Sequence, residues 1–456
     1  MDNTIAAIAT PVGEGGIGIV RISGDESLNI LKKIFKPFTN SDIESRKLTY
    51  GHIINPGDGT IVDEVLAVYM KGPKTYTAED VVEINCHGGL VPLKRVLELV
   101  LTYGAQIAEP GEFTKRAFLN GRLDLSQAEA VIDVIRAKTD KSFDVAMNQL
   151  QGGFSKVIED IRHKLVDVLV NLTVNIDYPD EDIEEINNQQ LISDLTVIRS
   201  DIQKLLDGSK SGKILRDGVN VAIIGKPNVG KSSLMNNLLR ESRAIVTEIP
   251  GTTRDTIEEF ININGIPVKI TDTAGIRNSD DIIEQIGIEK SKQSFNDADF
   301  VIFILDISRP LDDEDKVIIE KINHDKTLFV YNKIDKPAVI SDEVLAEITK
   351  DAPFVKTTMN DIEGTMVIEK ELYNLISSKN ENLNDTNLIS NARHIDSLKK
   401  AISSIDDALN SAMHGQAFEF VEIDVSAAYE NLGFITGDSV REDIIDEVFS
   451  RFCLGK

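Results

Sequence analysis

The chain has 456 residues, and its 49 Lys+Arg against 75 Asp+Glu give a formal charge of −26. This length predicts about three domains, and 41% hydrophobic with 27% charged residues excludes a disordered chain. No apolar run approaches the roughly 18–20 residues that span a bilayer, and no signal peptide opens the chain. Cys86 and Cys453 are too few and too far apart for a disulfide framework or a zinc site, so we expect a cytoplasmic protein. The acidity also argues against a broad nucleic-acid-binding face.

The first part of the chain alternates short apolar runs with Gly/Pro turns, a pattern typical of an α+β domain. A helix is predicted over Pro92–Tyr103, ending near Gly104. The predicted strands are Ile17–Ser23, Ile61–Met70 and Val81–Asn85.

The period then becomes helical. Ser126 and Glu129 have the spacing of a capping box, which predicts the start of a helix whose apolar positions continue to Leu150, before Gly152-Gly153. Two more helices carry the apolar positions of 158–176 and 191–205. The acidic segment between these two is interpreted as a solvated loop rather than a metal site.

A third pattern begins at Gly218, where buried strands alternate with helical spacers, as in a parallel, doubly wound sheet. The predicted strands are Val219–Ile224, Ile257–Ile263, Pro267–Thr271, Phe300–Leu305 and Leu328–Tyr331, with the second and third forming a hairpin across Asn264-Gly265. Helices return after about residue 380: Leu388 to Leu409, Phe418 to Leu432, and a last one capped by Ser439 with Glu442. The predicted organisation is therefore an α/β domain inserted into an all-helical one, with boundaries 1–119, 120–216, 217–379 and 380–456.

A phosphate-binding loop is the clearest motif of the sequence. Residues 225–232, GKPNVGKS, fit GxxxxGK[ST] and stand between a predicted strand and a predicted helix. Backbone N–H groups of such a loop cradle phosphates, Lys231 reaches the β/γ oxygens, and the Ser232 hydroxyl binds Mg²⁺.

Two further motifs identify the nucleotide. Asp272-Thr273-Ala274-Gly275 places a carboxylate near Mg²⁺ and an N–H at the γ-phosphate, while Asn332-Lys333-Ile334-Asp335 follows a buried strand. Asp335 can accept two hydrogen bonds from guanine, a donor pair that adenine lacks. The sequence therefore predicts a GTPase.

One expected residue is missing. A Gln directly after DxxG orients the attacking water in Ras-type switches, but here Ile276 occupies that position. The residues themselves leave several candidates for this role, namely Asn228, the segment 252–255 and the acids Asp280, Asp281 and Glu284. Arg254 is either a charge-stabilising finger or a structural partner of Asp255.

Gly13, Gly15 and Gly18 satisfy GxGxxG, but a strand follows them where a dinucleotide site needs a helix, so that interpretation is rejected. The basic stretch 110–124 either binds an anion or caps the neighbouring helix. The C-terminal tetrapeptide 453–456 by itself is typical of a frayed tail.

Taken together and in this order, these motifs resemble the family of tRNA modification GTPases called MnmE or TrmE, essentially from end to end. The resemblance is carried by the opening DNTIAAIATP, then by IVRISG, EFTKRAFLNGRLD and GTTRD, and by the terminal C-x-G-K.

The resemblance implies a homodimer joined through N-terminal domains that bind a tetrahydrofolate derivative, 5-formyl- or 5,10-methylene-tetrahydrofolate. It also implies a partner, MnmG (GidA), which uses FAD and NADH. The complex would add an aminomethyl or carboxymethylaminomethyl group to carbon 5 of the wobble uridine of certain tRNAs. Matched position by position, the folate contacts would be Arg21, Glu83, Arg122 and Lys456. No role is assigned to Cys453, because nothing in the sequence predicts a lowered thiol pKa.

The resemblance further implies K⁺-dependent GTP hydrolysis by G domains that meet face to face, with a cation replacing an arginine finger. K⁺ would be held by Asn228, Thr247, Ile249 and Thr252, while Thr253 would join Ser232 on Mg²⁺. Glu284 would orient the water, and catalysis would also use Asn228 and Lys231. The full GTP-binding set would be Asn228, Val229, Gly230, Lys231, Ser232, Ser233, Thr247, Glu248, Ile249, Pro250, Gly251, Thr252, Thr253, Asp272, Thr273, Ala274, Gly275, Asn332, Lys333, Asp335, Thr357, Thr358 and Met359.

The sequence departs from the family pattern in places. Thr357-Thr358-Met359 stands where a Ser-Ala-Lys-like base-stacking loop is expected, Glu14 where the family often has a basic residue, and Arg122 where Lys is common.

Two hypotheses thus compete. The first is an enzyme subunit that couples GTP hydrolysis to tRNA modification. The second is a GTP-gated switch for RNA or ribosome assembly without one-carbon chemistry. Only the first requires folate to bind at Arg21 and Glu83.

Overall fold

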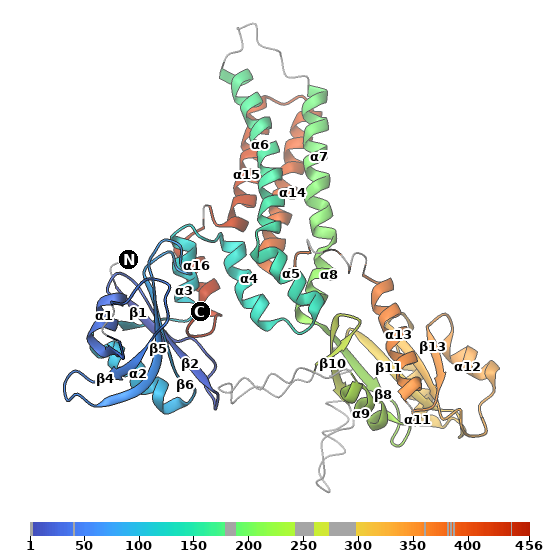
Figure 1. Cartoon of the computed structure of the whole chain (residues 1–456). Coiled ribbons are helices and arrows are strands. Elements are labelled where there is room, and N and C mark those ends of the chain that lie inside the picture. The colour runs from blue at the N-terminus through green and yellow to red at the C-terminus, as the bar shows by residue number, and fades with distance from the viewer. Residues whose placement is uncertain are drawn as a thin grey trace.

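The chain forms an N-terminal unit (β1 to α3), a helical part (α4 to α8 and α14 to α16) and a nucleotide unit (β8 to α13), as Figure 1 shows. A computed structural model describes residues 3–39, 42–177, 188–241, 260–272, 298–359, 362–380, 383, 385, 388–438 and 440–456. The nucleotide unit leaves the helical part after α8 and returns to it before α14, so the predicted insertion of an α/β domain into a helical one is confirmed.

A seven-stranded sheet, in the order β3-β4-β5-β6-β2-β1-β7, is the framework of the N-terminal unit. Its strands are β1 Ile5–Ile8, β2 Ile17–Ser23, β3 Phe35–Pro37, β4 Thr49–Ile54, β5 Ile61–Met70, β6 Val81–His87 and β7 Gln106–Ile107. Its helices are α1 Ser27–Ile34, α2 Leu90–Thr102 and α3 Glu112–Leu119. The apolar residues of α1 and α2 pack in one core with alternate residues of β2 and β6, while the opposite strand residues Arg21 and Glu83 face away from that core. Gly13 and Gly15 of the GxGxxG pattern precede β2 and Gly18 lies within it, so a strand stands where a dinucleotide site needs the start of a helix.

Four long helices, α6, α7, α14 and α15, share one apolar core in the helical part, and α4, α5 and α8 lie at its base (Figure 1). The first group is α4 Leu125–Arg136, α5 Asp140–Leu150, α6 Gly153–Asp177, α7 Asn188–Asp207 and α8 Ser209–Asp217. The second group is α14 Ala392–Met413, α15 Phe418–Thr436 and α16 Glu442–Ser450.

The predicted capping box at Ser126 and Glu129 is wrong. Asp124 caps α4, because its carboxylate accepts the Gln127 N–H at 2.8 Å and the Gln127 side chain accepts the Asp124 N–H at 3.0 Å. Ser126 is instead buried, and Glu129 pairs with Arg393 and His394. The spacing of polar residues could not distinguish a cap from a buried ion pair.

The single helix predicted up to Leu150 is two helices. Ala137 is extended, and Thr139 caps α5 by accepting the Ser142 N–H at 3.2 Å. The Thr139 hydroxyl also donates to the Gly265 carbonyl at 2.8 Å, so a contact with the β9–β10 turn fixes the break. The helix α14 begins at Ala392, capped by Asn391, four residues later in the chain than the predicted start near Leu388. Arg441 precedes α16 without a side-chain cap, and the predicted cap Ser439 lies outside the described residues.

A six-stranded sheet, in the order β13-β12-β11-β8-β10-β9, forms the nucleotide unit. Its strands are β8 Val219–Ile224, β9 Phe260–Ile263, β10 Ile266–Asp272, β11 Phe300–Asp306, β12 Thr327–Asn332 and β13 Phe354–Thr357. Its helices are α9 Lys231–Glu241, α11 Asp313–Lys321, α12 Asp342–Thr349 and α13 Ile362–Ser378. Only the edge strand β9 is antiparallel, as the hairpin motif predicted. The central strands β11 and β12 are buried throughout, since α9 and α13 cover one face and α11 and α12 the other.

Candidate functional site

The phosphate-binding loop joins the buried strand β8 to α9. A Cβ at Gly225 (φ +149°) would lie 2.5 Å from the Ile304 carbonyl oxygen, and one at Gly230 (φ +114°) would collide with Asn332 Nδ2. Both positions therefore require glycine for conformation and for space. Asn228 adopts a left-handed φ of +63° at the exposed tip of the loop.

Lys231 lies over this loop from the first turn of α9. Its ammonium donates to the Gly225 carbonyl at 2.5 Å and the Lys226 carbonyl at 2.8 Å, and only 7% of the residue is exposed. Ser232, the next residue, is exposed, and no acidic residue occupies the first turn. A helix N-terminus of this kind, beside a lysine ammonium and an exposed serine, suits a phosphate with its divalent cation.

The Asn332 side chain joins the loop to the end of β13. Its Nδ2 donates to the Val229 carbonyl at 2.6 Å, and its Oδ1 accepts the Met359 N–H at 3.1 Å. Asn332 is only 3% exposed, so these bonds are shielded from water. The structure thereby brings the predicted phosphate-loop and base-loop residues together.

Lys333 takes a left-handed φ of +67° and donates to Asp306 at 2.6 Å. Burial opposes ionisation of Asp306, but hydrogen bonds from Lys333 and Ser308 outweigh it and lower the pKa of this carboxyl. Asp335 is exposed beyond the strand end, where a base could reach it. In the atypical 357–359 segment, Thr357 and Met359 are buried, so Thr358 is the residue of the three that is partly open to solvent.

The ion pairs of Lys226 and of Lys333, near the phosphate-binding loop, were not predicted from the sequence. Lys226 pairs with Asp312, the N-cap of α11, and with Glu314 at 3.0 Å. Asp306 was likewise missed as the partner of Lys333. Asp312 and Asp315 form a capping box at the start of α11, and nothing in the sequence linked Asp312 to Lys226.

The switch residues of the prediction are not part of the described chain. This concerns Thr247, Glu248, Ile249, Pro250, Gly251, Thr252, Thr253, Thr273, Ala274, Gly275 and Glu284, and also Arg254, Asp255, Ile276, Asp280 and Asp281. Asp272 is placed by its backbone at the end of β10, opposite Ile223 of β8. That register brings Asp272 to the same sheet edge as the phosphate-binding loop.

A second site lies on the N-terminal unit, where Arg21 of β2 and Glu83 of β6 face each other. Arg21 Nε and Glu83 Oε1 are 2.8 Å apart, and both side chains are about a fifth exposed. The Arg21 guanidinium lies 5.7 Å from the ring centres of Tyr76 and Phe113. The Arg122 guanidinium lies 4.9 Å from the centre of the same Tyr76 ring and donates to the Tyr76 carbonyl at 3.0 Å. Tyr76 lies in none of the motifs, and Phe113, although it belongs to the segment EFTKRAFLNGRLD, received no role from the sequence.

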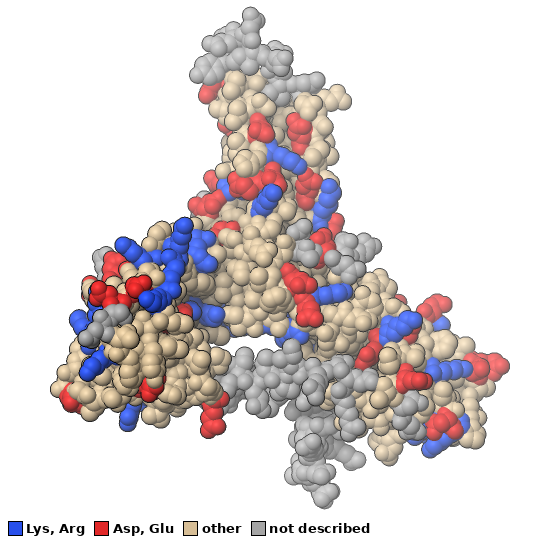
Figure 2. Space-filling model, viewed as in Figure 1, with Lys and Arg blue, Asp and Glu red and all other residues tan. Residues whose placement is uncertain are grey.

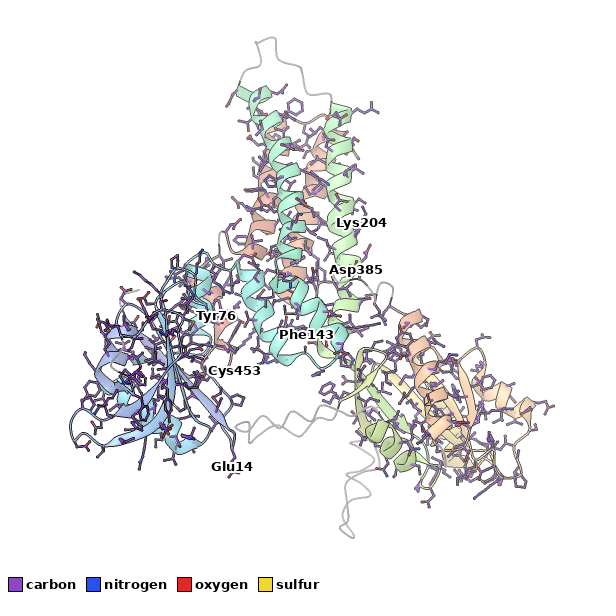
Figure 3. All side chains as sticks on the ribbon, in the orientation of Figure 1. Glu14, Tyr76, Phe143, Lys204, Asp385 and Cys453 are labelled. Carbon is purple, nitrogen blue, oxygen red and sulfur yellow. The ribbon has the colours of Figure 1, made fainter. Side chains whose placement is uncertain are left out.

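The C-terminal tail ends at this pair, so the frayed tail expected from composition is wrong. Arg21 Nη1 lies 3.5 Å from the Gly455 carbonyl oxygen, and the Gly111 N–H donates to the Cys453 carbonyl at 3.4 Å. Gly455 has a φ of +86°, and a Cβ there would collide with the Ile8 carbonyl oxygen. Lys456 is half-buried, and burial together with the charge of Arg21 lowers the pKa of its ammonium. Figure 3 labels Tyr76 and Cys453, which lie on the side of the N-terminal unit nearest the helical part.

The structure thus gathers all four residues that the resemblance implies for folate. Cationic groups from Arg21, Arg122 and Lys456 stand beside two aromatic rings and one carboxylate, a donor set that suits a planar anionic ligand. The basic stretch 110–124 is partly used internally, since Arg116 is buried between Glu79 and Glu112. Within the described residues, no helix is long and apolar enough to cross a membrane, and no cluster of three metal-ligating side chains occurs.

The phosphate-binding loop requires glycine at two positions, and Asp272 and the Asn332–Asp335 motif lie at the ends of strands of the same sheet. Together these features define a P-loop GTPase. A model described as "MnmE helical domain" matches residues 125–453, and one described as "GTP-binding protein TrmE N-terminus" matches residues 4–122. The tRNA modification GTPases MnmE of Alkaliphilus oremlandii and of Clostridioides difficile are each 50% identical to this chain over the full length of both proteins. That of Lactiplantibacillus plantarum is 47% identical over 100% of this chain and 98% of its own. The chain belongs to the MnmE family of tRNA modification GTPases, and it is a GTP hydrolase.

Proposed function

We propose that this protein couples GTP hydrolysis to one-carbon chemistry on tRNA. With a flavin- and NADH-using partner of the MnmG (GidA) kind, it adds an aminomethyl or carboxymethylaminomethyl group to carbon 5 of the wobble uridine of certain tRNAs. A tetrahydrofolate derivative, 5-formyl- or 5,10-methylene-tetrahydrofolate, supplies the carbon. The observation that carries this proposal is the tail: Gly455 and Lys456 are held against Arg21 and Glu83, an arrangement that a bare GTP switch does not need.

In the GTP step, Lys231 and the N–H groups of the loop hold the phosphates, and Asp335 accepts from the guanine base. Ser232 and Thr253 hold Mg²⁺, while Asn228, Thr247, Ile249 and Thr252 hold K⁺. These cations supply positive charge where negative charge develops on the transferred phosphate. Glu284 orients the attacking water, which Ile276 cannot do. Support comes from the exposure of Asn228 and Ser232 on the same loop as the buried Lys231.

In the one-carbon step, Arg21, Arg122 and Lys456 bind and orient the anionic donor, and Glu83 fixes the Arg21 guanidinium. The proposed division of the chain is 1–119 for donor binding and homodimerisation, 217–379 for GTP, and 120–216 with 380–456 for the helical domain. Because tRNA and its modifying enzymes meet there, the protein acts in the cytoplasm.

The first experiment is mass spectrometry of tRNA nucleosides from cells with and without the gene. Loss of the modified wobble uridine on deletion, restored by the wild-type chain, supports the proposal. An unchanged nucleoside profile would leave the GTPase but remove the modification, and RNA or ribosome assembly would then be its output.

The second experiment separates the two sites. Titration with a reduced folate is expected to show binding to the wild-type chain and to Lys94→Ala, whose lysine lies on the exposed side of α2, but not to Arg21→Ala. A folded wild-type chain that binds no folate contradicts the one-carbon step.

The third experiment concerns the cations. Replacing KCl by NaCl should slow GTP hydrolysis, and Glu284→Ala should lower kcat with little change in GTP affinity. Equal rates in both salts would reject K⁺ as the charge-stabilising group and favour Arg254.

A further inference from the structure

Four exposed cationic side chains cluster on two neighbouring loops of the N-terminal unit. Arg46 and Lys47 precede β4, and Lys71 and Lys74 follow β5; these four residues are called the basic edge below. The chain as a whole carries a charge of −26, so such a cluster stands out. Figure 2 shows Lys and Arg side chains gathered on the part of the N-terminal unit nearest the helical part.

Backbone contacts bring the two loops of the basic edge together. The Arg46 N–H donates to the Tyr69 carbonyl at 2.7 Å, and the Lys71 N–H donates to Ser45 Oγ at 3.1 Å. The Arg46 guanidinium then reaches the Lys74 carbonyl at 2.6 Å. Arg46 and Ala78 both have a left-handed φ, of +65° and +61°, although neither is glycine. This backbone conformation is unfavourable for residues other than glycine, so surrounding contacts must hold these loops in one arrangement.

The positive charge of the basic edge is only partly neutralised. Glu44 pairs with Lys47 at 2.9 Å, and Asp42 lies in the same loop. Asp80 is occupied by the Tyr69 hydroxyl and the Gly72 N–H. Among the described residues, no carboxylate forms an ion pair with Arg46, Lys71 or Lys74. Three cations therefore remain available to an anion in solution.

The basic edge is close in sequence to the Arg21–Glu83 pocket. Lys74 lies two residues before Tyr76, whose ring centre is 5.7 Å from the Arg21 guanidinium and 4.9 Å from that of Arg122. Because two residues of chain span at most about 7 Å, a polyanion held at Lys74 would lie close to Tyr76 and to the proposed donor site.

We propose that the basic edge binds the phosphate backbone of the tRNA substrate and positions the nucleotide to be modified beside the Arg21–Glu83 pocket. This inference rests on the proposed function, because it takes tRNA as the substrate. Phosphate contacts fix the register of a nucleic acid without reading its sequence, which fits a surface made of flexible lysines. A local surface of this kind also agrees with the absence of a broad basic face in so acidic a chain.

The test is tRNA binding by the full chain, measured by fluorescence anisotropy. The KCl concentration is varied from about 50 to about 200 mM, because counterion release makes phosphate binding strongly salt-dependent in this range. The variant is the triple substitution Arg46→Gln, Lys71→Gln, Lys74→Gln, which removes the three cations that the described carboxylates leave unpaired. The control is Lys32→Gln, Lys33→Gln, Lys94→Gln, which removes the same charge from exposed positions of α1 and α2. The first triple should weaken binding about tenfold and make the slope of log K against log[KCl] shallower by about 2. GTP hydrolysis should be unchanged in both.

Equal tRNA affinities for the two triple variants would overturn the proposal, and so would a wild-type chain that binds no tRNA. Failure of the proposed function is detected separately, by a nucleoside profile that does not change on deletion of the gene. The proposal is supported if the first triple variant binds tRNA more weakly than the control triple and deletion of the gene removes the modified nucleoside.

Discussion

Two clusters of charged side chains contain similar groups, but their carboxylates differ in how far they are exposed to water. At the base of the helical part, Glu129 of α4 accepts two hydrogen bonds from Arg393 of α14, at 2.9 and 2.8 Å, and lies 2.7 Å from His394. At the phosphate-binding loop, Lys226 pairs with Asp312 and Glu314. The Glu129 carboxylate is 8% exposed, whereas the carboxylates of Asp312 and Glu314 are 50% and 79% exposed, although the Lys226 side chain between them is only 9% exposed.

The difference in exposure indicates two roles. Arg393 also donates to the Phe434 and Ile435 carbonyls of α15, so the buried cluster joins α4 to helices that come after the inserted nucleotide unit in the chain. Water cannot replace these bonds without opening the helical core, and the cluster therefore maintains the architecture. At the phosphate-binding loop the two carboxylates are open to water and can exchange Lys226 for water, so this cluster leaves the loop adjustable.

The largest effect is expected from breaking the buried cluster. Glu129→Ala leaves the Arg393 guanidinium without its carboxylate in a buried position, which should lower the free energy of unfolding of the helical part by about 3–5 kcal/mol. Urea denaturation followed by circular dichroism measures this. Glu98→Ala, at an exposed pair on α2, is the control and should change stability by less than about 0.5 kcal/mol. Similar values for the two variants would remove the architectural role.

Acid should break the same cluster without mutation. Burial opposes ionisation of Glu129, but the charges and hydrogen bonds of His394 and Arg393 outweigh it and lower the pKa of the carboxyl to about 2. A carboxyl with a pKa depressed on folding stabilises the native state above its unfolded pKa, so about 3 kcal/mol should be lost as the pH falls from about 4.5 to about 2. Melting curves of the wild type and Glu129→Gln across this range measure the loss. A wild-type curve parallel to that of the variant would contradict it.

The tail contact lies between these extremes, because it is partly buried and depends on one glycine. Gly455→Ala combines a left-handed φ with a collision at Ile8, so the tail should detach at a cost of roughly 2 kcal/mol or more. Carboxypeptidase should then remove Lys456 faster, and reduced-folate binding should weaken while GTP hydrolysis stays unchanged. Gly121→Ala, with φ +71° and open space around it, isolates the conformational strain and should leave the tail protected.

Whether the partners of a residue lie near it or far from it in the chain explains what the sequence could predict. The phosphate-binding loop is made of consecutive residues between one strand and one helix, so its motif was readable in the chain. The Arg21 pocket joins residues from β2, β6, the loop at Tyr76 and the C-terminus, and only the family resemblance brought its charged members together. Tyr76 and Phe113 were missed because their role is set by distant contacts. Glu129 was assigned to a cap for the same reason, since its partners lie 264 residues or more away.

The smallest effect is expected from Lys226→Ala, and it tests the exposed side of the comparison. Asp312 and Glu314 stay solvated without their partner, and Asp312 still caps α11 by accepting the Glu314 and Asp315 N–H groups. The melting temperature should therefore shift by about 1 °C or less, and more salt should not change it further. Because Lys231 keeps its acceptor at the backbone carbonyl of residue 226, GTP affinity should stay within about twofold of the wild type. Calorimetry and nucleotide titration measure the two quantities. A melting shift comparable to that of Glu129→Ala would mean that Lys226 anchors the loop rather than leaving it adjustable.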